Sequence, residues 1–157
     1  LLCLSAGVRF RLIEDYLNGT GVFHDITGRM LRERGYDVPE RTPEEAGESL
    51  YRISRDFDFT LFEFFVSDIA GHAADMEKAV SELELFDSML AVLLSRVDLG
   101  SEMIWVASDH GNIEDLTVTT HTRNPVPVIA AGKAPEGCTI QITSLVDIAP
   151  SILGLFP

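Results

Sequence analysis

Two of the chain's four histidines stand close to carboxylates that follow apolar runs, and a third lies in the loop beyond them. His72 comes four residues after Asp68 in the stretch "SDIAGH", and His110 directly follows Asp109 in "SDHGN". His121 lies eleven residues beyond His110. Imidazole nitrogens and carboxylate oxygens are ligands that Zn²⁺ and Mn²⁺ take in proteins. These five residues are therefore candidate metal ligands.

The spacing of the candidates limits how they could share ions. Asp68 and His72 lie on one face if their turn is helical, and Gly71 lets other groups approach that turn closely. On extended backbone Asp109 and His110 would diverge and serve two centres, whereas in a tight turn they could bracket a pair of ions. Five ligands are too many for one tetrahedral ion and too few for two complete sites.

A pair of divalent ions would allow this acidic chain to take part in phosphoryl transfer. Ions about 3.5–4 Å apart serve phosphoryl transfer, because they clamp the attacking and leaving oxygens together. The loop that carries His121 is held by Pro125 and Pro127, which restrict its backbone. Such ions would also attract an anionic substrate to a chain of strongly negative charge.

Ordinary structural roles compete with these interpretations. A single Asp or His at the end of a strand is usually a cap or a satisfied hydrogen-bonding group, and only the combination of several favours a metal site. His24 has no carboxylate at a strand end beside it and is interpreted as a structural residue at a helix start. The role of Glu63, inside an apolar run, stays open because a buried carboxylate needs a partner or an edge position.

The elements that must position these residues alternate between helices and strands. Residues 59–66, 102–108 and 126–132 are β-prone apolar runs of the kind found in buried strands. Helices are expected over residues 22–34, from the cap at Thr42, over 74–97, and from Ser144 to the end of the chain. Thr42, Pro43 and Glu45 form a capping-box signature. The alternation predicts an α/β three-layer sandwich with a mostly parallel sheet.

Bulk properties exclude some classes of function. The 157 residues suit one domain, and 12 basic against 25 acidic residues give a net charge of −13. This charge argues against nucleic-acid binding, and no apolar run approaches the roughly 20 residues that span a membrane. Cys3 and Cys138 lack metal or redox spacing, so we expect free thiols in a reducing cytoplasm.

The stretch "SDHGNIED…HTRNPVPVI", preceded by "SDIAGH" and followed by "LVDIAPSIL", resembles the metalloenzyme core of the alkaline phosphatase superfamily. The closest branch is the cofactor-independent phosphoglycerate mutases and their uncharacterised relatives, and the resemblance covers about residues 42–157. It implies that Asp68, His72 and His121 hold one divalent ion, Mn²⁺ or Zn²⁺, and that Asp109 and His110 contribute to a second. Asn112 and Arg123 would at most lie behind the ligands or face the substrate.

The resemblance also implies what this chain lacks. In the family a Ser or Thr from an N-terminal Asp-Gly segment completes the second site and becomes phosphorylated, but no such segment precedes Asp68, and Ser5 lacks the context. The chain begins at Leu1 inside an apolar run, so we expect a single C-terminal domain, residues 1–157, of a longer protein. Residues 1–41 would be the remnant of a link to a missing N-terminal part.

The function expected of the whole protein is transfer of a phosphoryl group on a small phosphorylated substrate through a phospho-Ser or phospho-Thr. The fragment alone should be inactive and bind one metal ion or none. Two alternatives remain open: a phosphatase or phosphopentomutase-like activity on another phosphate ester, and a non-catalytic metal-binding domain. Loss of leading strands would expose a sheet edge, so self-association is also expected.

Overall fold

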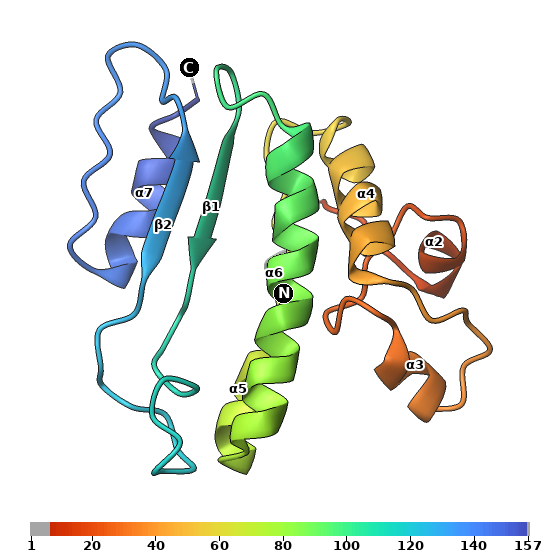
Figure 1. The fold of residues 1–157 in the computed structure, drawn as a ribbon. Helices are drawn as coiled ribbons and strands as arrows, with labels where there is room; N and C mark the ends of the chain where they lie inside the picture. Colours follow the sequence, from red (N-terminus) through yellow and green to blue (C-terminus); the bar gives the residue numbers. More distant parts are fainter. Residues whose placement is uncertain (1–6, 157) are drawn as a thin grey trace.

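The structure is a computed structural model that describes residues 7–156, with its helices gathered beside a small sheet (Figure 1). The apolar run at the start of the chain lies almost wholly outside the described residues, as do Cys3 and Ser5. The elements are, in chain order, α2 (Ile13–Leu17), α3 (Arg29–Glu33), α4 (Pro43–Ser54), α5 (Val66–Ala73), α6 (Met76–Arg96), β1 (Met103–Ala107), β2 (Val128–Gly132), the 3₁₀ turn η1 (Leu145–Asp147) and α7 (Ile148–Leu153).

Helix α4 starts where its capping signature predicts. The Thr42 hydroxyl accepts the backbone N–H of Glu45 at 3.2 Å, and the Glu45 carboxylate accepts the N–H of Thr42 at 2.9 Å. Pro43 occupies the first helical position, where no N–H is needed. The capping box is therefore confirmed, and it gives α4 a defined start beside the long helix α6.

Helix α6 supplies the main core together with α4. Asp75 caps it by accepting the N–H of Lys78 at 3.0 Å, close to the expected start at residue 74. Met89, 1% exposed, packs with Ala46, Leu50 and Ile26, and burial of such a side chain stabilises the fold by about 1.5–3 kcal/mol. Four other apolar side chains of α6 are exposed: Met76, Val80, Leu83 and Leu94.

The prediction of a helix over residues 22–34 is mostly wrong, because only the short helix α3 forms there. The buried carboxylate of Asp25 accepts the N–H groups of Gly28 and Met30, both at 2.7 Å, and so holds the backbone in a turn. Ile26 and Gly28 have positive φ angles of 68° and 76°, which an α-helix cannot contain. Side-chain capture of backbone donors thus delays the helix until Arg29.

The mostly parallel sheet of the expected three-layer sandwich does not appear in the described residues. β1 and β2 form a two-stranded antiparallel sheet, with Met103 opposite Gly132 and Ala107 opposite Val128. The physical reason is the connection between them, residues 108–127, which contains no helix and turns straight back, whereas a parallel neighbour needs a crossover. The α/β class itself stands.

Residues 59–65 form no helix and join no ladder with the described strands, and Val66 already belongs to α5. Alternate side chains face opposite ways: Phe62 and Phe64 pack on the core, while Leu61 and Glu63 are exposed. The prediction of a strand buried on both faces is therefore wrong. Glu63 needs no buried partner, because it lies at the surface.

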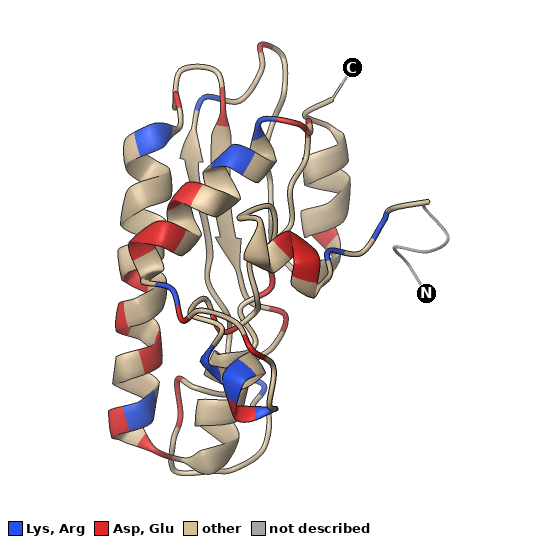
Figure 2. Cartoon of the chain, turned by 90° about the vertical axis from the view of Figure 1, so that its right-hand side faces the viewer, with Lys and Arg blue, Asp and Glu red and all other residues tan. Residues whose placement is uncertain are grey.

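The end of the chain follows its expected cap. The carboxylate of Asp147 accepts the backbone N–H groups of Thr143 and Ser144, both at 2.9 Å, and η1 leads into α7. Acidic positions recur along the helices, in line with the charge of −13 (Figure 2). None of the helices in the described residues is both long and apolar enough to cross a membrane.

Candidate metal centre

Helix α5 presents the first two candidate ligands. It begins directly after residues 59–65, and its helical turn places Asp68 and His72 on one face. Asp68 Oδ1 lies 3.5 Å from His72 Nε2. The predicted same-face arrangement of this pair is present. Both side chains remain partly exposed, so the pair is open to a ligand from outside.

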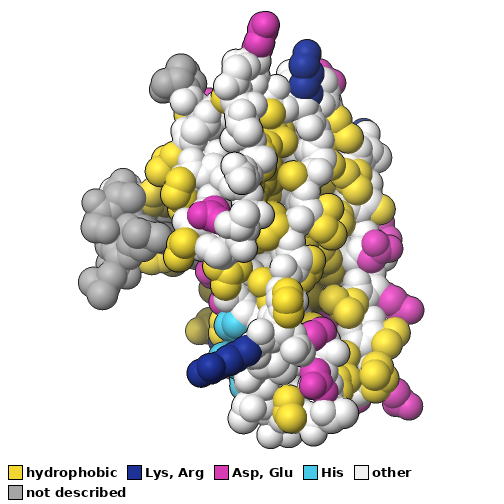
Figure 3. Space-filling view, turned by 90° about the vertical axis from the view of Figure 1, so that its left-hand side faces the viewer, with side chains coloured by type: hydrophobic (Ala, Val, Ile, Leu, Met, Phe, Trp, Pro, Cys, Tyr) yellow, Lys and Arg dark blue, Asp and Glu magenta, His cyan; other side chains and the backbone are white. Residues whose placement is uncertain are grey.

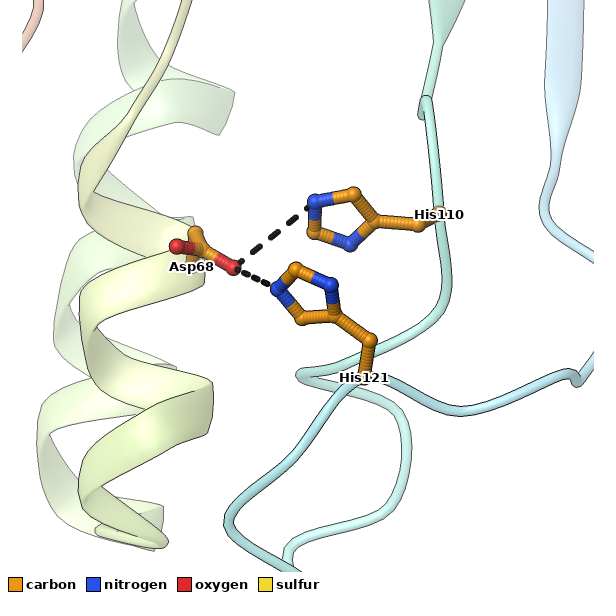
Figure 4. A group of neighbouring side chains, drawn as sticks. All are labelled: Asp68, His110 and His121. Atoms are coloured by element: carbon orange, nitrogen blue, oxygen red, sulfur yellow. Dashed lines mark ion pairs between the residues drawn. The ribbon is translucent and has the colours of Figure 1, made fainter.

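The loop between β1 and β2 brings the other two histidines to the same carboxylate. His121 Nε2 lies 3.3 Å and His110 Nε2 3.9 Å from Asp68 Oδ1 (Figure 4). The two rings stack with centroids 3.7 Å apart and an interplanar angle of 20°. An isolated bridge between Gly111 and Thr122 joins the two sides of the loop and places the rings together.

His72 has a ring nitrogen whose hydrogen is fixed by a backbone carbonyl. His72 Nδ1 lies 2.8 Å from the carbonyl oxygen of Thr119, so this nitrogen carries the hydrogen and Nε2 has the lone pair. That Nε2 lies 3.1 Å from Nε2 of His121 and faces Asp68 Oδ1. Lone pairs beside a carboxylate oxygen repel unless a proton or a cation lies between them. A backbone carbonyl behind a metal-binding imidazole fixes its tautomer in the same way.

The donor set fits one divalent cation. Donor atoms of Asp68, His110 and His121 all lie within 4.8 Å of one another. His72 Nε2 lies beside two of them, 3.5 Å from the Asp68 oxygen and 3.1 Å from His121 Nε2. Three imidazole nitrogens and one carboxylate oxygen suit Zn²⁺ or Mn²⁺ in tetrahedral or higher coordination. The cluster opens onto the surface beneath the sheet, where histidine side chains are visible (Figure 3).

Asp109 approaches the cluster from its exposed side, next to His110. Its side chain is 89% exposed, and its Oδ2 is 3.7 Å from His110 Nε2. The structure thus gathers Asp68, His72, His110 and His121 around one point and leaves Asp109 at the margin. A second ion at Asp109 and His110 stays a prediction, although His110 faces Asp68, which was expected to bind the first ion.

Asn112 is a buried support of the cluster, 4% exposed. Its amide Nδ2 donates to the carboxylate of Asp68 at 2.6 Å and to the Asp68 carbonyl at 3.2 Å. Gly71 makes room for it, because a Cβ at that position would come within 2.3 Å of the Asn112 side-chain oxygen. Asn112 therefore lies behind a candidate ligand, as expected, whereas Arg123 is exposed.

Sequence reasoning missed Glu114. Its carboxylate accepts hydrogen bonds from Thr122 Oγ1, from Asn124 Nδ2 at 3.0 Å and from the backbone N–H of Asn112 at 2.5 Å. These bonds, led by that from Thr122, lower the pKa of Glu114 from 4.5 to about 2. The sequence offered one signal. Glu114 is an acidic residue in the loop between His110 and His121, and no basic residue lies near it in the sequence.

His24 lies outside the cluster, in agreement with its structural interpretation. Its ring packs against Phe23, with centroids 4.2 Å apart, and edge-on to Phe65 at 5.9 Å. Burial lowers the pKa of His24 below its ordinary value of 6.5.

Comparisons with known proteins agree with the resemblance seen in the sequence. The family model described as the Metalloenzyme superfamily matches residues 18–157. A 2,3-bisphosphoglycerate-independent phosphoglycerate mutase of Dinoroseobacter shibae is 36% identical over 76% of this chain and 25% of its own length. The protein of that name from Staphylococcus epidermidis is 32% identical over 95% of this chain and 28% of its own.

The chain therefore spans about a quarter of the length of the curated relatives it matches. No solved structure gives a significant match to it.

Proposed function

The chain belongs to the Metalloenzyme superfamily, and from that premise we propose that it is the metal-binding portion of a phosphoglycerate-mutase-like enzyme. The complete enzyme would transfer a phosphoryl group on a small phosphorylated substrate through a phospho-Ser or phospho-Thr that lies outside this chain. The relatives' printed name supports the reaction class. The free thiol of Cys138 is in keeping with a reducing, cytoplasmic location.

One observation carries the proposal: a single carboxylate oxygen of Asp68 faces the Nε2 atoms of His72, His110 and His121 at 3.3–3.9 Å. These four residues would hold Mn²⁺ or Zn²⁺. A bound ion of this kind stabilises charge on phosphoryl oxygens and acts as a Lewis acid. Asp109, exposed next to His110, would serve a second ion once the rest of the enzyme supplies further ligands.

Within this chain, the residues have separable tasks. The carbonyl of Thr119 holds the His72 ring in the tautomer that leaves Nε2 free. The Asn112 amide fixes the orientation of the Asp68 carboxylate. Both interactions keep the donor atoms in place before any ion arrives, which lowers the cost of binding.

Calorimetric titration of the EDTA-treated chain with Mn²⁺ or Zn²⁺ alone tests the proposal. We expect one ion per chain and a rise in thermal stability, equivalent to about 2.7 kcal/mol at 100 times Kd. Replacement of supporting residues typically weakens metal binding about 10- to 100-fold, so loss of the ligand in His121→Ala should exceed that range.

The matched control is His24→Ala, which removes a histidine outside the cluster and should leave metal affinity unchanged. Equal affinity in His121→Ala and the unaltered chain would overturn the proposed site. A mutase and phosphatase assay on the chain alone should show no turnover, and sustained turnover would contradict a nucleophile outside this chain.

A further inference from the structure

Glu114 connects the two sides of the loop that carries His110 and His121. On one side the backbone N–H of Asn112, two residues after His110, donates to Oε2 at 2.5 Å. On the other side the hydroxyl of Thr122, adjacent to His121, donates to Oε1. The carboxylate is thus shared by the segments that follow the two histidines.

The space around this carboxylate is closely filled. A Cβ on Gly111 would lie 2.2 Å from Thr122 Oγ1 and 2.6 Å from Glu114 Oε1, so only glycine allows this approach. The backbone N–H of Thr122 also donates to the Gly111 carbonyl at 2.8 Å. Asn124 adds a further hydrogen bond to Oε1 at 3.0 Å. The loop is therefore locked at one register although the Glu114 side chain reaches the surface.

All three groups that contact the Glu114 carboxylate donate hydrogen bonds to it. The side chain at position 114 must therefore act only as a hydrogen-bond acceptor. An ionised carboxylate meets this need, and the low pKa of Glu114, about 2, keeps it ionised at neutral pH. A glutamine of the same shape would direct its own N–H₂ group at one of these donors. Neither oxygen of Glu114 is left to act as a metal ligand of the cluster without giving up a loop contact.

We propose that Glu114 is a positioning residue that sets the stacked arrangement of His110 and His121 and thereby the metal affinity of the cluster. The inference rests on the proposed function, because it assigns Glu114 a task toward the same ion. The ring stack at 3.7 Å is the feature that Glu114 maintains. Its effect on the ion is indirect, through Asn112 on one side and Thr122 on the other.

The experiment compares Glu114→Gln with the unaltered chain in two measurements. Calorimetric titration with Mn²⁺ or Zn²⁺ alone should show Kd raised about 10- to 100-fold, the usual effect of losing a supporting residue. Proton NMR of the metal-free chain should show the contact between the His110 and His121 rings weakened. The matched control is Glu136→Gln, the same change at an exposed position, which should alter neither measurement.

Thr122 provides a second pair of variants in case Glu114→Gln does not fold. Thr122→Val removes the hydroxyl donor at nearly constant shape and should raise Kd, while Thr122→Ser keeps the donor and should restore it. A purely structural role for Glu114 would lower thermal stability without changing Kd or the ring contact. That result would overturn the inference.

These measurements distinguish a wrong role for Glu114 from a wrong proposed function. If the unaltered chain binds metal and both Glu114→Gln and Thr122→Val bind it equally well, the inference fails and the proposed function stands. If the unaltered chain binds no metal, the proposed function fails, and the assignment of metal affinity to Glu114 fails with it. The ring contact in the metal-free chain then still decides whether Glu114 positions the histidines.

Discussion

At the scale of single residues, Asp68 is oriented before it meets any ligand. The Asn112 amide binds its carboxylate at 2.6 Å, while three imidazole nitrogens face the same oxygen. An amide donor satisfies part of the carboxylate's hydrogen-bonding capacity and limits its rotation. Asp68 is thus held in place by a neutral neighbour, which leaves its charge available to a cation.

His24 provides a prediction about pH. Burial lowers its pKa from 6.5, and its Nδ1 is buried with no hydrogen-bond partner among the described residues. The unfolded chain therefore takes up the proton first as pH falls. Stability from the neutral His24 is complete above about pH 6.5 and declines below it, toward the lower pKa of the folded state.

Urea unfolding at pH values from 8 to 5, in EDTA, checks this expectation. The difference in unfolding free energy between the unaltered chain and His24→Phe should stay constant above pH 6.5 and move in favour of His24→Phe as the pH falls. Phenylalanine suits the site because His24 packs between the rings of Phe23 and Phe65. A difference that does not vary with pH would contradict the prediction.

At the scale of residues, the sequence predicted which side chains could bind a metal ion, but not which side chains contact one another in the fold. The sequence singled out five candidate ligands: Asp68, His72, Asp109, His110 and His121. In the structure the three histidines face one oxygen of Asp68, and Asp109 lies exposed beside His110. Glu114 escaped notice because its significance depends on donors up to ten residues away in the folded loop.

At the scale of elements, the β1–β2 loop can approach α5 closely because Gly71 has no side chain. A Cβ at Gly71 would lie 2.3 Å from Oδ1 and 2.5 Å from Cγ of Asn112. Glycine inside a helix ordinarily costs about 0.5–1 kcal/mol relative to alanine. Here the close contact reverses that preference.

We predict that Gly71→Ala destabilises the fold by about 1–3 kcal/mol, as overpacking does, instead of stabilising it. Urea unfolding measures the change. The control is Ser81→Ala on the exposed face of α6, where the change should stay within about 0.5 kcal/mol. A stability gain in Gly71→Ala would show that Asn112 can move aside freely.

Elements with strong local signals were predictable, and those that depend on distant partners were not. The capping box at Thr42 and Glu45 acts within four residues, and α4 begins as expected. The expected helix over residues 22–34 failed because Asp25 captures the backbone donors of Gly28 and Met30. The sequence does not show whether an aspartate within a helical pattern will bind backbone N–H groups and so prevent the helix from forming.

At the scale of the whole molecule, large apolar side chains remain uncovered. Leu61 is 71% exposed, and Phe59 and Phe65, on the same segment of residues 59–65, are more than half exposed. Apolar side chains also gather on the face of β2 and the C-terminal segment (Figure 3). Exposed apolar patches beside backbone outside any ladder favour association between chains.

We therefore predict that this chain self-associates through residues 59–65. Light scattering coupled to size-exclusion chromatography should show a mass that rises with protein concentration, and Leu61→Glu should lower it. Leu153→Glu is the matched control, since Leu153 is equally exposed at 71% but lies on α7. A monomer at all concentrations, or equal effects of both variants, would contradict the prediction.

The sequence by itself determined what acts over short distances. Helix caps, the i and i+4 spacing of Asp68 and His72, and the donor types of a metal site follow from residues that are neighbours along the chain. The family resemblance followed from such motifs, and the match over residues 18–157 confirms it.

Only the tertiary structure decided which candidates meet. Asp68 and Asn112 are 44 residues apart, and His72 and His121 are 49, so their contacts depend on how α5 packs beside the loop. The antiparallel return of β2 was equally undetermined, because an apolar run has the same pattern in either direction. Strand direction and ligand pairing arise from chain connections and packing, which residue types alone do not specify.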